Sequence, residues 1–597
     1  MKKFLQQTFA SFIGSLAGLF FFFALSAGGL FFFFMALLMS SNTPQVENQS
    51  VLVFNLNSQI TDSTGDRPLA TVLSEESPSV LTLRQITTAI NRAAEDERIT
   101  ALFLDGSRGN INTGYGSLSE IKTALENFKN SGKKIISYNV SAGEKDYFLT
   151  SIADEVYLNP LGSLEMNGLS SSQLFFADAL DRYGIGVQII RVGQYKSAVE
   201  PFTRNDFSPE SRLQTEELLT NLWDIYTDEI SNPRSLTPSN INNIADNIGF
   251  LKAEEAEELA LIDGLSYLDE VNDNLKVISN NENSESLPTI DIRKYVTITN
   301  NTNNQNVKDT IAILHIDGNI VDGMGRVGEV GGDRMAQEIE KIRDDDNIKG
   351  VIVRINSPGG SAIASERITR ELELTAQEKP IVISMGDVAA SGGYWIATAG
   401  EKIFANESTI TGSIGVFGLL FNLEDIADSV GVNADVIKTN ELADINNTFQ
   451  AKTDQEIEIY QSNVDQIYNL FLEKVAQSRN LSIPEVDEIA QGRVWLGNIA
   501  QEIGLVDEIG GLDSAIEYLN TVLELNEQYK IQEFPQRRNW ENELLTALEN
   551  SQLNTNKINK AALANTIWNL NSELELIDII EKPNRIYSIL PFKMNIK

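Results

Sequence analysis

The chain of 597 residues contains no cysteine and a single histidine, His315. The absence of cysteine excludes disulfides, thiol catalysis and cysteine-containing metal sites. A Ser-His-Asp triad would have to use His315, which lies in the apolar run TIAILHI at Thr310–Ile316. That run is typical of a core strand, where a lone histidine is more often structural than catalytic. If a serine is the nucleophile, lysine is therefore the expected base.

Basic residues are also scarce, with 47 Lys and Arg against 84 Asp and Glu, and the formal net charge is −37. Because such a chain has no evident basic surface to neutralise phosphates, its composition argues against nucleic-acid binding. We expect no metal and no cofactor either.

Charge is absent altogether from Phe12–Met39, which contains two runs of four phenylalanines. At about 1.5 Å per residue, a helix of this length crosses a hydrocarbon core of about 30 Å with tilt. The run is longer than the apolar part of a signal peptide and no A-x-A cleavage site follows it, so a retained anchor is favoured over a cleaved signal. Lys2 and Lys3 predict a cytoplasmic N-terminus, with everything after Ser40 on the far side.

A candidate nucleophile lies in IVISMGDVAASGGYWIATAG at Ile381–Gly400. The β-branched run gives way to small residues and then to an apolar segment that can form a helix, so Ser391 is predicted at a strand-to-helix turn. Gly392 and Gly393 would let a substrate carbonyl approach the backbone, and the amide after the nucleophile is a natural oxyanion donor. The alternative is structural, with Ser391 as an N-cap where a helix packs on a sheet.

Short apolar runs alternate with amphipathic segments from about Val51 onward, which favours a parallel α/β sheet. The predicted strand Gly186–Val192 runs into Gly193-Gln194-Tyr195-Lys196. Sites in open α/β sheets form beyond the carboxyl ends of strands, so Lys196 is well placed for chemistry, although an ordinary solvated lysine would fit the same position. In the second half, the glycines of the predicted turn Asn356–Gly360 expose backbone amides that could complete an oxyanion hole.

The two halves of the chain match each other at a separation close to 247 residues. Lys134–Ser137 faces Pro380–Ile383, and Leu261–Asp263 faces Leu505–Asp507. The sequence therefore predicts a tandem duplication.

The two copies differ at the candidate residues. Since Tyr147 matches Tyr394, the position opposite Ser391 is Glu144, and the position opposite Lys196 is Ala443. One copy keeps the serine and the other the lysine, which is hard to explain if both residues are merely structural.

Three motifs carry a family resemblance: RVGQYKSAVEPFTRNDFSP around Lys196, RINSPGGS at Arg354–Ser361, and MGDVAASGGYWIATA around Ser391. With them, the chain from about Val51 to Leu519 resembles the long form of the bacterial signal peptide peptidases, the SppA or protease IV family. The resemblance implies a Ser-Lys dyad serine endopeptidase with a fold like that of Clp protease and crotonase. It also implies a bowl-shaped homotetramer at the bacterial inner membrane, with periplasmic catalytic domains that degrade cleaved signal peptides and other hydrophobic peptides.

Carried onto this sequence, the resemblance makes Ser391 the nucleophile and Lys196 the general base. Ser413, in the segment TGSIG, would hydrogen-bond the lysine, while Gly359 and Gly392 would offer oxyanion amides. A neutral lysine can accept the serine proton, and burial without a carboxylate partner would lower its pKa.

The predicted fold is α/β, a tandem duplication of a Clp protease/crotonase-like domain preceded by one transmembrane helix. The predicted parts are a cytoplasmic N-terminus and anchor (1–47), a repeat supplying lysine (48–285), a linker (286–307), a repeat supplying serine (308–525) and a helical tail (526–597).

Two other functions fit the same fold. A crotonase-type acyl-CoA enzyme would use similar glycine amides for a thioester oxyanion, but it would leave both candidate residues idle and the anchor unexplained. A catalytically dead scaffold would only bind membrane peptides.

Overall fold

The computed structural model describes residues 45–63, 80–300, 307–526, 528–536 and 586–589. The predicted anchor at Phe12–Met39 lies outside these residues, as does most of the tail. Within the described ranges, no helix is both long and apolar enough to cross a membrane.

The first repeat is built on a six-stranded parallel sheet. In spatial order its strands are β10 (Gly264–Leu265), β6 (Glu155–Leu158), β5 (Lys134–Asn139), β4 (Ile99–Gly106), β1 (Ser50–Asn55) and β11 (Thr289–Asp291). Its central strands consist of the apolar runs that the sequence predicts, and both of their faces are buried.

The second repeat contains an eight-stranded sheet with the same core order. Its strands are β22 (Glu508–Ile509), β18 (Lys402–Ala405), β17 (Ile381–Ala390), β15 (Ile348–Ser357), β12 (Thr310–Asp317) and β23 (Lys530–Phe534), with β19 (Ile410–Gly412) and β21 (Val494–Leu496) attached beside β17. Six strands of each sheet thus follow one another in the same spatial order, so the predicted duplication of an α/β domain is confirmed.

This correspondence corrects two predicted boundaries. β11 lies in the predicted linker 286–307 but pairs with β1, and β23 lies in the predicted helical tail but pairs with β12. Each repeat therefore ends with an edge strand that the sequence-based boundaries cut off. The tail was predicted to be helical, but its described residues contain two strands, β23 and β24 (Ile586–Ile589).

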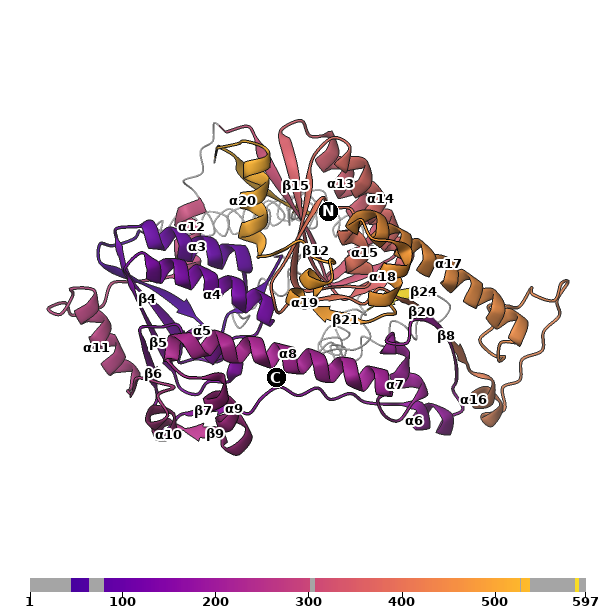
Figure 1. Ribbon diagram of the computed structural model, residues 1–597, viewed down its shortest axis with the longest axis horizontal. Helices are drawn as coiled ribbons and strands as arrows, with labels where there is room; N and C mark the ends of the chain where they lie inside the picture. The colour runs from indigo at the N-terminus through magenta and orange to yellow at the C-terminus, as the bar shows by residue number, and fades with distance from the viewer. Residues whose placement is uncertain (1–44, 64–79, 301–306, 527, 537–585, 590–597) are drawn as a thin grey trace, which may run out of the picture.

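Helices cover both faces of each sheet (Figure 1). In the first repeat they are α3 (Leu83–Glu95), α4 (Tyr115–Asn130), α5 (Glu144–Thr150), α6 (Ala177–Arg182), α7 (Glu200–Thr203), α8 (Pro209–Arg234), α9 (Pro238–Asn247), α10 (Ala253–Glu258), α11 (Leu268–Ile278) and α12 (Ile292–Asn300). In the second they are α13 (Gly332–Asp344), α14 (Ala362–Ala376), α15 (Gly392–Ala397), α16 (Glu424–Ser429), α17 (Asp454–Arg479), α18 (Ile483–Ile489), α19 (Gly497–Glu502) and α20 (Leu512–Val522).

The long helices α8 and α17 show why matching sequences give matching elements. Each has 26 residues and begins at a side chain that caps the helix, Ser208 for α8 and Thr453 for α17. Each ends at a residue in the left-handed conformation, Ser235 and Asn480.

A third sheet joins the two repeats. Its order is β14 (Glu329–Gly331), β13 (Asn319–Val321), β16 (Gly359–Ser361), β24, β20 (Val416–Asn422) and β8 (Gly186–Val192). β8 comes from the first repeat and pairs antiparallel with β20 along its whole length. This pairing carries the end of β8, and the loop that follows it, into the second repeat.

The remaining strands are short pairs in the first repeat. β2 (Gln59–Thr61) pairs with β3 (Val80–Thr82), and β7 (Ser163–Met166) pairs with β9 (Gly249–Lys252).

Candidate active site

The structure brings Lys196 of the first repeat against Ser391 of the second. The Lys196 Nζ atom lies 2.7 Å from the Ser391 Oγ atom, and both residues are fully buried. Lys196 follows β8 and begins a short 3-10 helix, Ser197–Val199, so the β8·β20 pairing determines its position. Two residues that the sequence assigns to different repeats therefore contact each other in the folded chain.

Ser391 lies between β17 and α15, the strand-to-helix turn that the sequence predicts. Its backbone has φ 57° and ψ −114°, a conformation that is costly for a residue with a side chain. The Ser391 amide donates to the Gly412 carbonyl at 2.8 Å, and the Ser391 carbonyl accepts from the Trp395 amide at 2.8 Å. These bonds hold a strained residue in place, which is common where a side chain must be aimed at a substrate.

Ser413 is the third residue of the group. Lys196 Nζ donates to its hydroxyl at 2.9 Å and to its carbonyl at 3.0 Å. Ser413 is buried, has a positive φ of 53°, and its amide donates to the Arg493 carbonyl at 2.7 Å. Two oxygens of one residue thus orient the amine toward Ser391.

Two glycines that the sequence analysis did not single out make room for Lys196. A Cβ on Gly492 would lie 2.7 Å from the backbone nitrogen of Lys196, and one on Gly415 would lie 3.3 Å from the Lys196 Cδ. Gly492 has a φ of 77°, which a side chain would strain further. In the sequence it is an ordinary glycine between a helix and a strand, so no signal distinguished it.

Burial lowers the pKa of Lys196 well below its ordinary value. In the described part of the chain, its ammonium group contacts hydroxyl and carbonyl oxygens and forms no ion pair. Because no carboxylate offsets the desolvation, the neutral amine is favoured. A neutral amine within hydrogen-bond distance of a serine hydroxyl is able to accept its proton.

The candidate oxyanion amides lie on either side of this contact. Gly392 begins α15 directly after Ser391, and Gly359 follows the turn at the end of β15. The Gly359 amide donates to the Ser357 hydroxyl at 3.2 Å, and Gly359 has a φ of 102°. The turn also packs against the start of α15, since a Cβ on Gly393 would lie 2.9 Å from the Ser357 carbonyl oxygen.

Strand β24 lies beside Gly359. It runs antiparallel to β16, with Gly359 opposite Ile589, and antiparallel to β20, with Phe417 opposite Tyr587. The backbone of the C-terminal tail thus fills a strand position between the Gly359 turn and the strand that follows Ser413 (Figure 1).

His315 does not take part in this group. It is buried on β12, and its Nε2 atom lies 3.8 Å from the Glu533 carboxylate. The alternative that it serves as the base of Ser391 is not supported, because the contact of the Ser391 hydroxyl is with Lys196.

Comparison with known proteins gives two matches to one family. The profile of Peptidase family S49 matches residues 127–281 and 373–526, one match in each repeat. The chain belongs to peptidase family S49. Protease 4 of Haemophilus influenzae is 35% identical over 82% of this chain and 81% of its own length. Protease 4 of Salmonella typhi is 35% identical over 73% of this chain and 71% of its own.

Two further similarities are more distant. The chloroplastic serine protease SPPA of Arabidopsis thaliana is 33% identical over 79% of this chain and 69% of its own length. Among solved structures, a ClpP1 mutant from Listeria monocytogenes shows 16% identity and a TM-score of 0.24 over 34% of this chain and 94% of that chain. Membership of family S49, with relatives of the protease 4 type, makes the protein a serine-type peptidase.

Tyr147 and Tyr394 make equivalent hydrogen bonds in the two S49 repeats, and this equivalence identifies the residue that corresponds to Ser391. The Tyr147 hydroxyl donates to the Leu261 carbonyl at 2.6 Å, and the Tyr394 hydroxyl donates to the Leu505 carbonyl at 2.8 Å. Glu144 therefore begins α5 where Ser391 precedes α15. The first repeat thus has a buried glutamate where the second has a serine, and burial raises the pKa of the Glu144 carboxyl.

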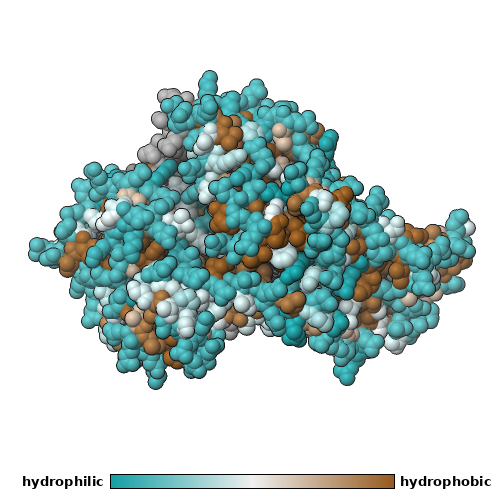
Figure 2. Space-filling view, in the orientation of Figure 1, coloured by the Kyte–Doolittle hydropathy of each residue, from teal (hydrophilic) through white to brown (hydrophobic). Residues whose placement is uncertain are grey.

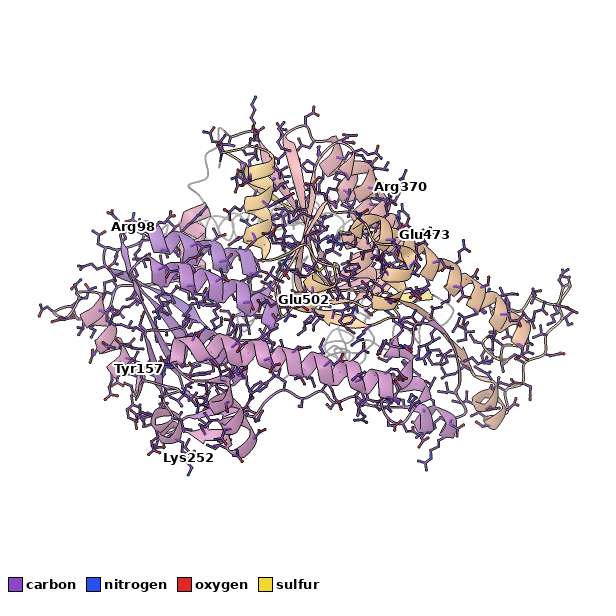
Figure 3. All side chains as sticks on the ribbon, viewed as in Figure 1. Arg98, Tyr157, Lys252, Arg370, Glu473 and Glu502 are labelled. Carbon is purple, nitrogen blue, oxygen red and sulfur yellow. The ribbon has the colours of Figure 1, made fainter. Side chains whose placement is uncertain are left out.

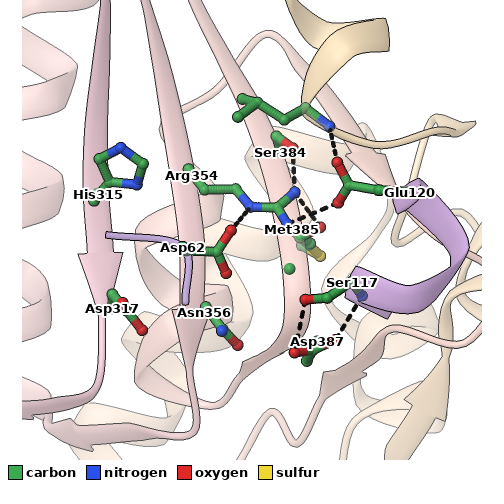
Figure 4. Close-up of polar contacts among 12 residues, drawn as sticks. Asp62, Ser117, Glu120, His315, Asp317, Arg354, Asn356, Ser384, Met385 and Asp387 are labelled. Carbon is green, nitrogen blue, oxygen red and sulfur yellow. Dashed lines mark hydrogen bonds and ion pairs between the residues drawn. The ribbon is translucent and has the colours of Figure 1, made fainter. Parts of the chain in front are cut away.

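A buried ionic cluster fastens the two S49 repeats together near the strands that lead to the site (Figure 4). Arg354 of β15 is fully buried and ion-pairs at 2.7 Å with Asp62 and at 2.7 Å with Glu120, both from the first repeat. Its Nη1 atom also donates to the Ser384 hydroxyl and the Met385 carbonyl. Burial acts to lower the pKa of Arg354, but the two carboxylates raise it, so the guanidinium stays charged.

A second contact lies closer to the nucleophile. Asp387, four residues before Ser391 on β17, accepts from the Ser117 amide at 2.7 Å and from the Ser117 hydroxyl at 2.9 Å. These donors lie in the first turn of α4, where the helix dipole favours a negative charge. The strands that lead to Gly359 and to Ser391 are thus both anchored to the repeat that carries Lys196.

Charged side chains elsewhere mostly face solvent. Arg98, Lys252, Arg370 and Glu473 are exposed and spread over distant parts of the surface (Figure 3). Within the described residues, the ion pairs of these and other charged side chains do not include Lys196.

Proposed function

We propose that this S49 peptidase is an endopeptidase with a Ser-Lys dyad, in which Ser391 is the nucleophile and Lys196 the general base. One observation carries the proposal: a buried lysine without an ion-pair partner lies 2.7 Å from a serine hydroxyl at a strained turn. The relatives named as proteases support the same reaction.

In the proposed reaction, neutral Lys196 takes the proton of the Ser391 hydroxyl as the oxygen attacks the peptide carbonyl. The protonated lysine then gives this proton to the leaving amine, which departs and leaves an acyl-enzyme on Ser391. Lys196 next takes a proton from water as the water oxygen attacks the ester. It then gives this proton to the Ser391 oxygen as the ester bond breaks, which releases the acid and restores both residues. Ser413 positions the amine throughout, because it accepts from Nζ through two oxygens.

The amides of Gly359 and Gly392 are the proposed donors to the tetrahedral oxyanion. For Gly359 this requires that its amide leave the Ser357 hydroxyl, from which it lies 3.2 Å in this structure. A substrate in extended conformation fits the strand edges of β16 and β20, between which the backbone of β24 now runs.

Hydrophobic peptides, cleaved signal peptides among them, are the proposed substrates. An apolar peptide can enter a site in which Lys196 must remain dry, since its side chains bring no charge that would restore the ammonium form. The proposed location is the periplasmic side of the bacterial inner membrane, with residues 12–39 as the anchor and the N-terminus in the cytoplasm. We also propose that the chain assembles as a homotetramer with a Clp protease/crotonase-like fold in each repeat.

Labelling with a fluorophosphonate tests the reaction. The full-length protein should be labelled at one serine, and Ser391→Ala should lose both the label and peptide hydrolysis while keeping a cooperative melting transition. An acyl-CoA enzyme or an inactive scaffold would not label. Hydrolysis by a well-folded Ser391→Ala variant would disprove the assignment of the nucleophile.

Location has its own test. The protein should stay in the membrane fraction through alkaline carbonate extraction, whereas release of a chain that begins after Ala27 would show a cleaved signal.

A further inference from the structure

A loop of the second repeat supports both the proposed base and the serine that orients it. The amide of Tyr195, the residue before Lys196, donates to the Gln491 carbonyl at 2.9 Å. The Ser413 amide donates to the Arg493 carbonyl at 2.7 Å. The position of the lysine relative to Ser413 therefore depends on this loop.

Gln214 of α8 fastens this supporting loop, residues 490–493, to the loop that carries the lysine. Its side-chain amide donates to the Tyr195 carbonyl at 3.2 Å, and its side-chain carbonyl accepts at 3.2 Å from the amide of Val494, the first residue of β21. The same side-chain amide also donates to the Ser197 hydroxyl at 3.4 Å. One side chain thus bridges the two loops.

The burial of Gln214 is unusual for its residue type. Glutamine is mostly found on protein surfaces, and the surface visible in Figure 2 is largely hydrophilic. Gln214 is only 2% exposed, although Arg212, Leu213 and Glu216 of the same helix are exposed. A buried amide is costly unless its donor and its acceptor are both used, and here both bond to backbone groups. The bridge therefore accounts for the burial.

The duplication connects this glutamine with the lysine. α8 and α17 begin after the capping residues Ser208 and Thr453, so Gln214, six residues after its cap, corresponds to Ile459. An isoleucine side chain forms no hydrogen bond, and the repeat that contains it has Ala443 in place of the lysine. The glutamine is thus present in the repeat that supplies the proposed base.

We infer that Gln214 is a positioning residue, which keeps the Lys196 amine in contact with Ser391 by bridging the lysine loop to β21. The inference deepens the proposed reaction and rests on it. Without the bridge, the lysine loop is held less firmly to the second repeat, and Lys196 leaves its buried position more often. An amine in water is protonated at neutral pH and cannot act as a base.

Charged groups on the neighbouring elements have partners of their own. Glu200, four residues after Lys196, accepts from the Ser208 amide and hydroxyl at the start of α8. Arg493 of the supporting loop forms an ion pair with Glu217 of α8. Burial is the cause of the lowered pKa of Lys196, so a change in this pKa reports a change in its exposure to water.

Fluorophosphonate labelling of the full-length protein over a range of pH tests the inference. Gln214→Met keeps the length of the side chain but removes its donor and its acceptor. If the bridge favours the buried position of the lysine about tenfold, as one or two hydrogen bonds can, the midpoint of the labelling rate should move upward by about one pH unit. Below the midpoint the rate should fall about tenfold, while the plateau at high pH stays unchanged.

Thr215→Val is the matched control, because Thr215 is also buried on α8 but its hydroxyl donates to the Ser211 carbonyl within the helix. It should leave both the midpoint and the rate unchanged. Gln214→Asn is the second test variant, since its amide is one methylene shorter and cannot span both loops. It should move the midpoint in the same direction as Gln214→Met. Thermal melting shows whether each variant folds.

A midpoint that stays at the value of the unmodified protein in either well-folded Gln214 variant would overturn the inference. Loss of the cooperative melting transition in both variants would overturn it too, because Gln214 would then be needed for the fold and not for the position of the lysine. Failure of the proposed reaction gives a different result. The unmodified protein would then not be labelled, or Lys196→Ala would be labelled as fast as the unmodified protein.

Discussion

At the scale of residues, the proposed reaction at Ser391 depends on keeping Lys196 uncharged. Lys196 contacts two serine residues and is lined by Gly415 and Gly492, and the described residues around it offer no ion pair. In the proposed reaction, burial without a counter-ion is therefore what makes Lys196 a base, and no second charged group is needed.

Replacing the lysine should abolish activation of Ser391. Lys196→Ala should lower the rate of fluorophosphonate labelling near neutral pH by about 10²-fold to 10⁴-fold, the usual contribution of a general base. Lys196→Arg should be no better, since a guanidinium stays protonated and cannot accept the serine proton. Normal labelling of either variant would show that the base lies elsewhere.

The burial of Lys196 predicts how the labelling rate and the stability of the protein change with pH. The labelling rate should rise with pH and reach its plateau well below pH 10.5, because the pKa of Lys196 is lowered in the folded state. The unfolded chain then binds the extra proton between the lowered pKa and the ordinary value, so the lysine costs stability at neutral pH and this cost fades as the pH approaches 10.5.

Lys196→Met should therefore raise the melting temperature at pH 7 and flatten its dependence on pH, while labelling is lost. Thermal unfolding followed from pH 6 to pH 10 measures this difference. A melting temperature that falls at pH 7 would show that the lysine is charged and stabilised in the folded protein.

Ser391 was predicted from its strand-to-helix turn and Lys196 from its place after a strand, and the repeat favoured both because neither has a counterpart in the other copy. It could not locate Gly492, whose role is to leave space next to Lys196, a residue 296 positions away in the chain. An absent side chain gives no chemical signal, and the contact exists only after both repeats have packed.

At the scale of elements, β15 and β17 each lead into a turn that carries a proposed site residue, and each is anchored to the first repeat. Arg354 on β15 pairs with Asp62 and Glu120, and Asp387 on β17 accepts from Ser117. These pairs could not be predicted from the sequence, because the partners lie hundreds of residues apart.

Removing the buried guanidinium of Arg354 should destabilise the folded protein. Arg354→Met removes the cation that faces two buried carboxylates, so we expect a loss of about 3–5 kcal/mol in the free energy of unfolding. The exposed ion pair of Arg367 with Asp333 provides the control, and Arg367→Met should change this free energy by less than about 1 kcal/mol. Urea denaturation measures both values. Equal effects of the two substitutions would mean that the cluster is not a structural anchor.

Removal of the tail strand should increase activity. An extended substrate needs the edges of β16 and β20 that β24 occupies, so deletion of residues 584–597 should raise kcat/KM for a hydrophobic peptide. The increase is about tenfold if nine molecules in ten hold the tail in this position. A synthetic peptide of residues 584–597 should inhibit the shortened enzyme competitively, and a scrambled peptide should not. Unchanged kinetic constants after deletion would show that the tail and the substrate do not compete.

The elements that sequence periodicity missed are those whose partners are distant. The apolar runs of β1, β4, β12 and β15 were predicted because burial on both faces leaves a continuous apolar pattern. β11 and β23 are edge strands of mixed composition, and only their pairing with β1 and β12 makes them strands.

At the scale of the whole molecule, each repeat contributes one residue to the proposed dyad. The lysine lies in the first and the serine in the second, and the third sheet joins them within one chain. A chain that arose from two equal copies could have carried two sites, but Glu144 and Ala443 remove the second.

This arrangement makes a specific prediction about mixed assemblies. Lys196→Ala and Ser391→Ala each destroy one partner of the dyad, and in both variants the intact partner lies opposite the damaged one in the same chain. Because β8 pairs with β20 of its own chain, assemblies that contain both variants should have no peptidase activity, even after dissociation and reassembly together. As a control, wild-type chains reassembled with an excess of Ser391→Ala chains should keep the activity expected from the number of wild-type chains. Recovery of activity in the mixture of the two variants would show that Lys196 of one copy serves Ser391 of another, and that the repeats exchange between chains in the assembled protein.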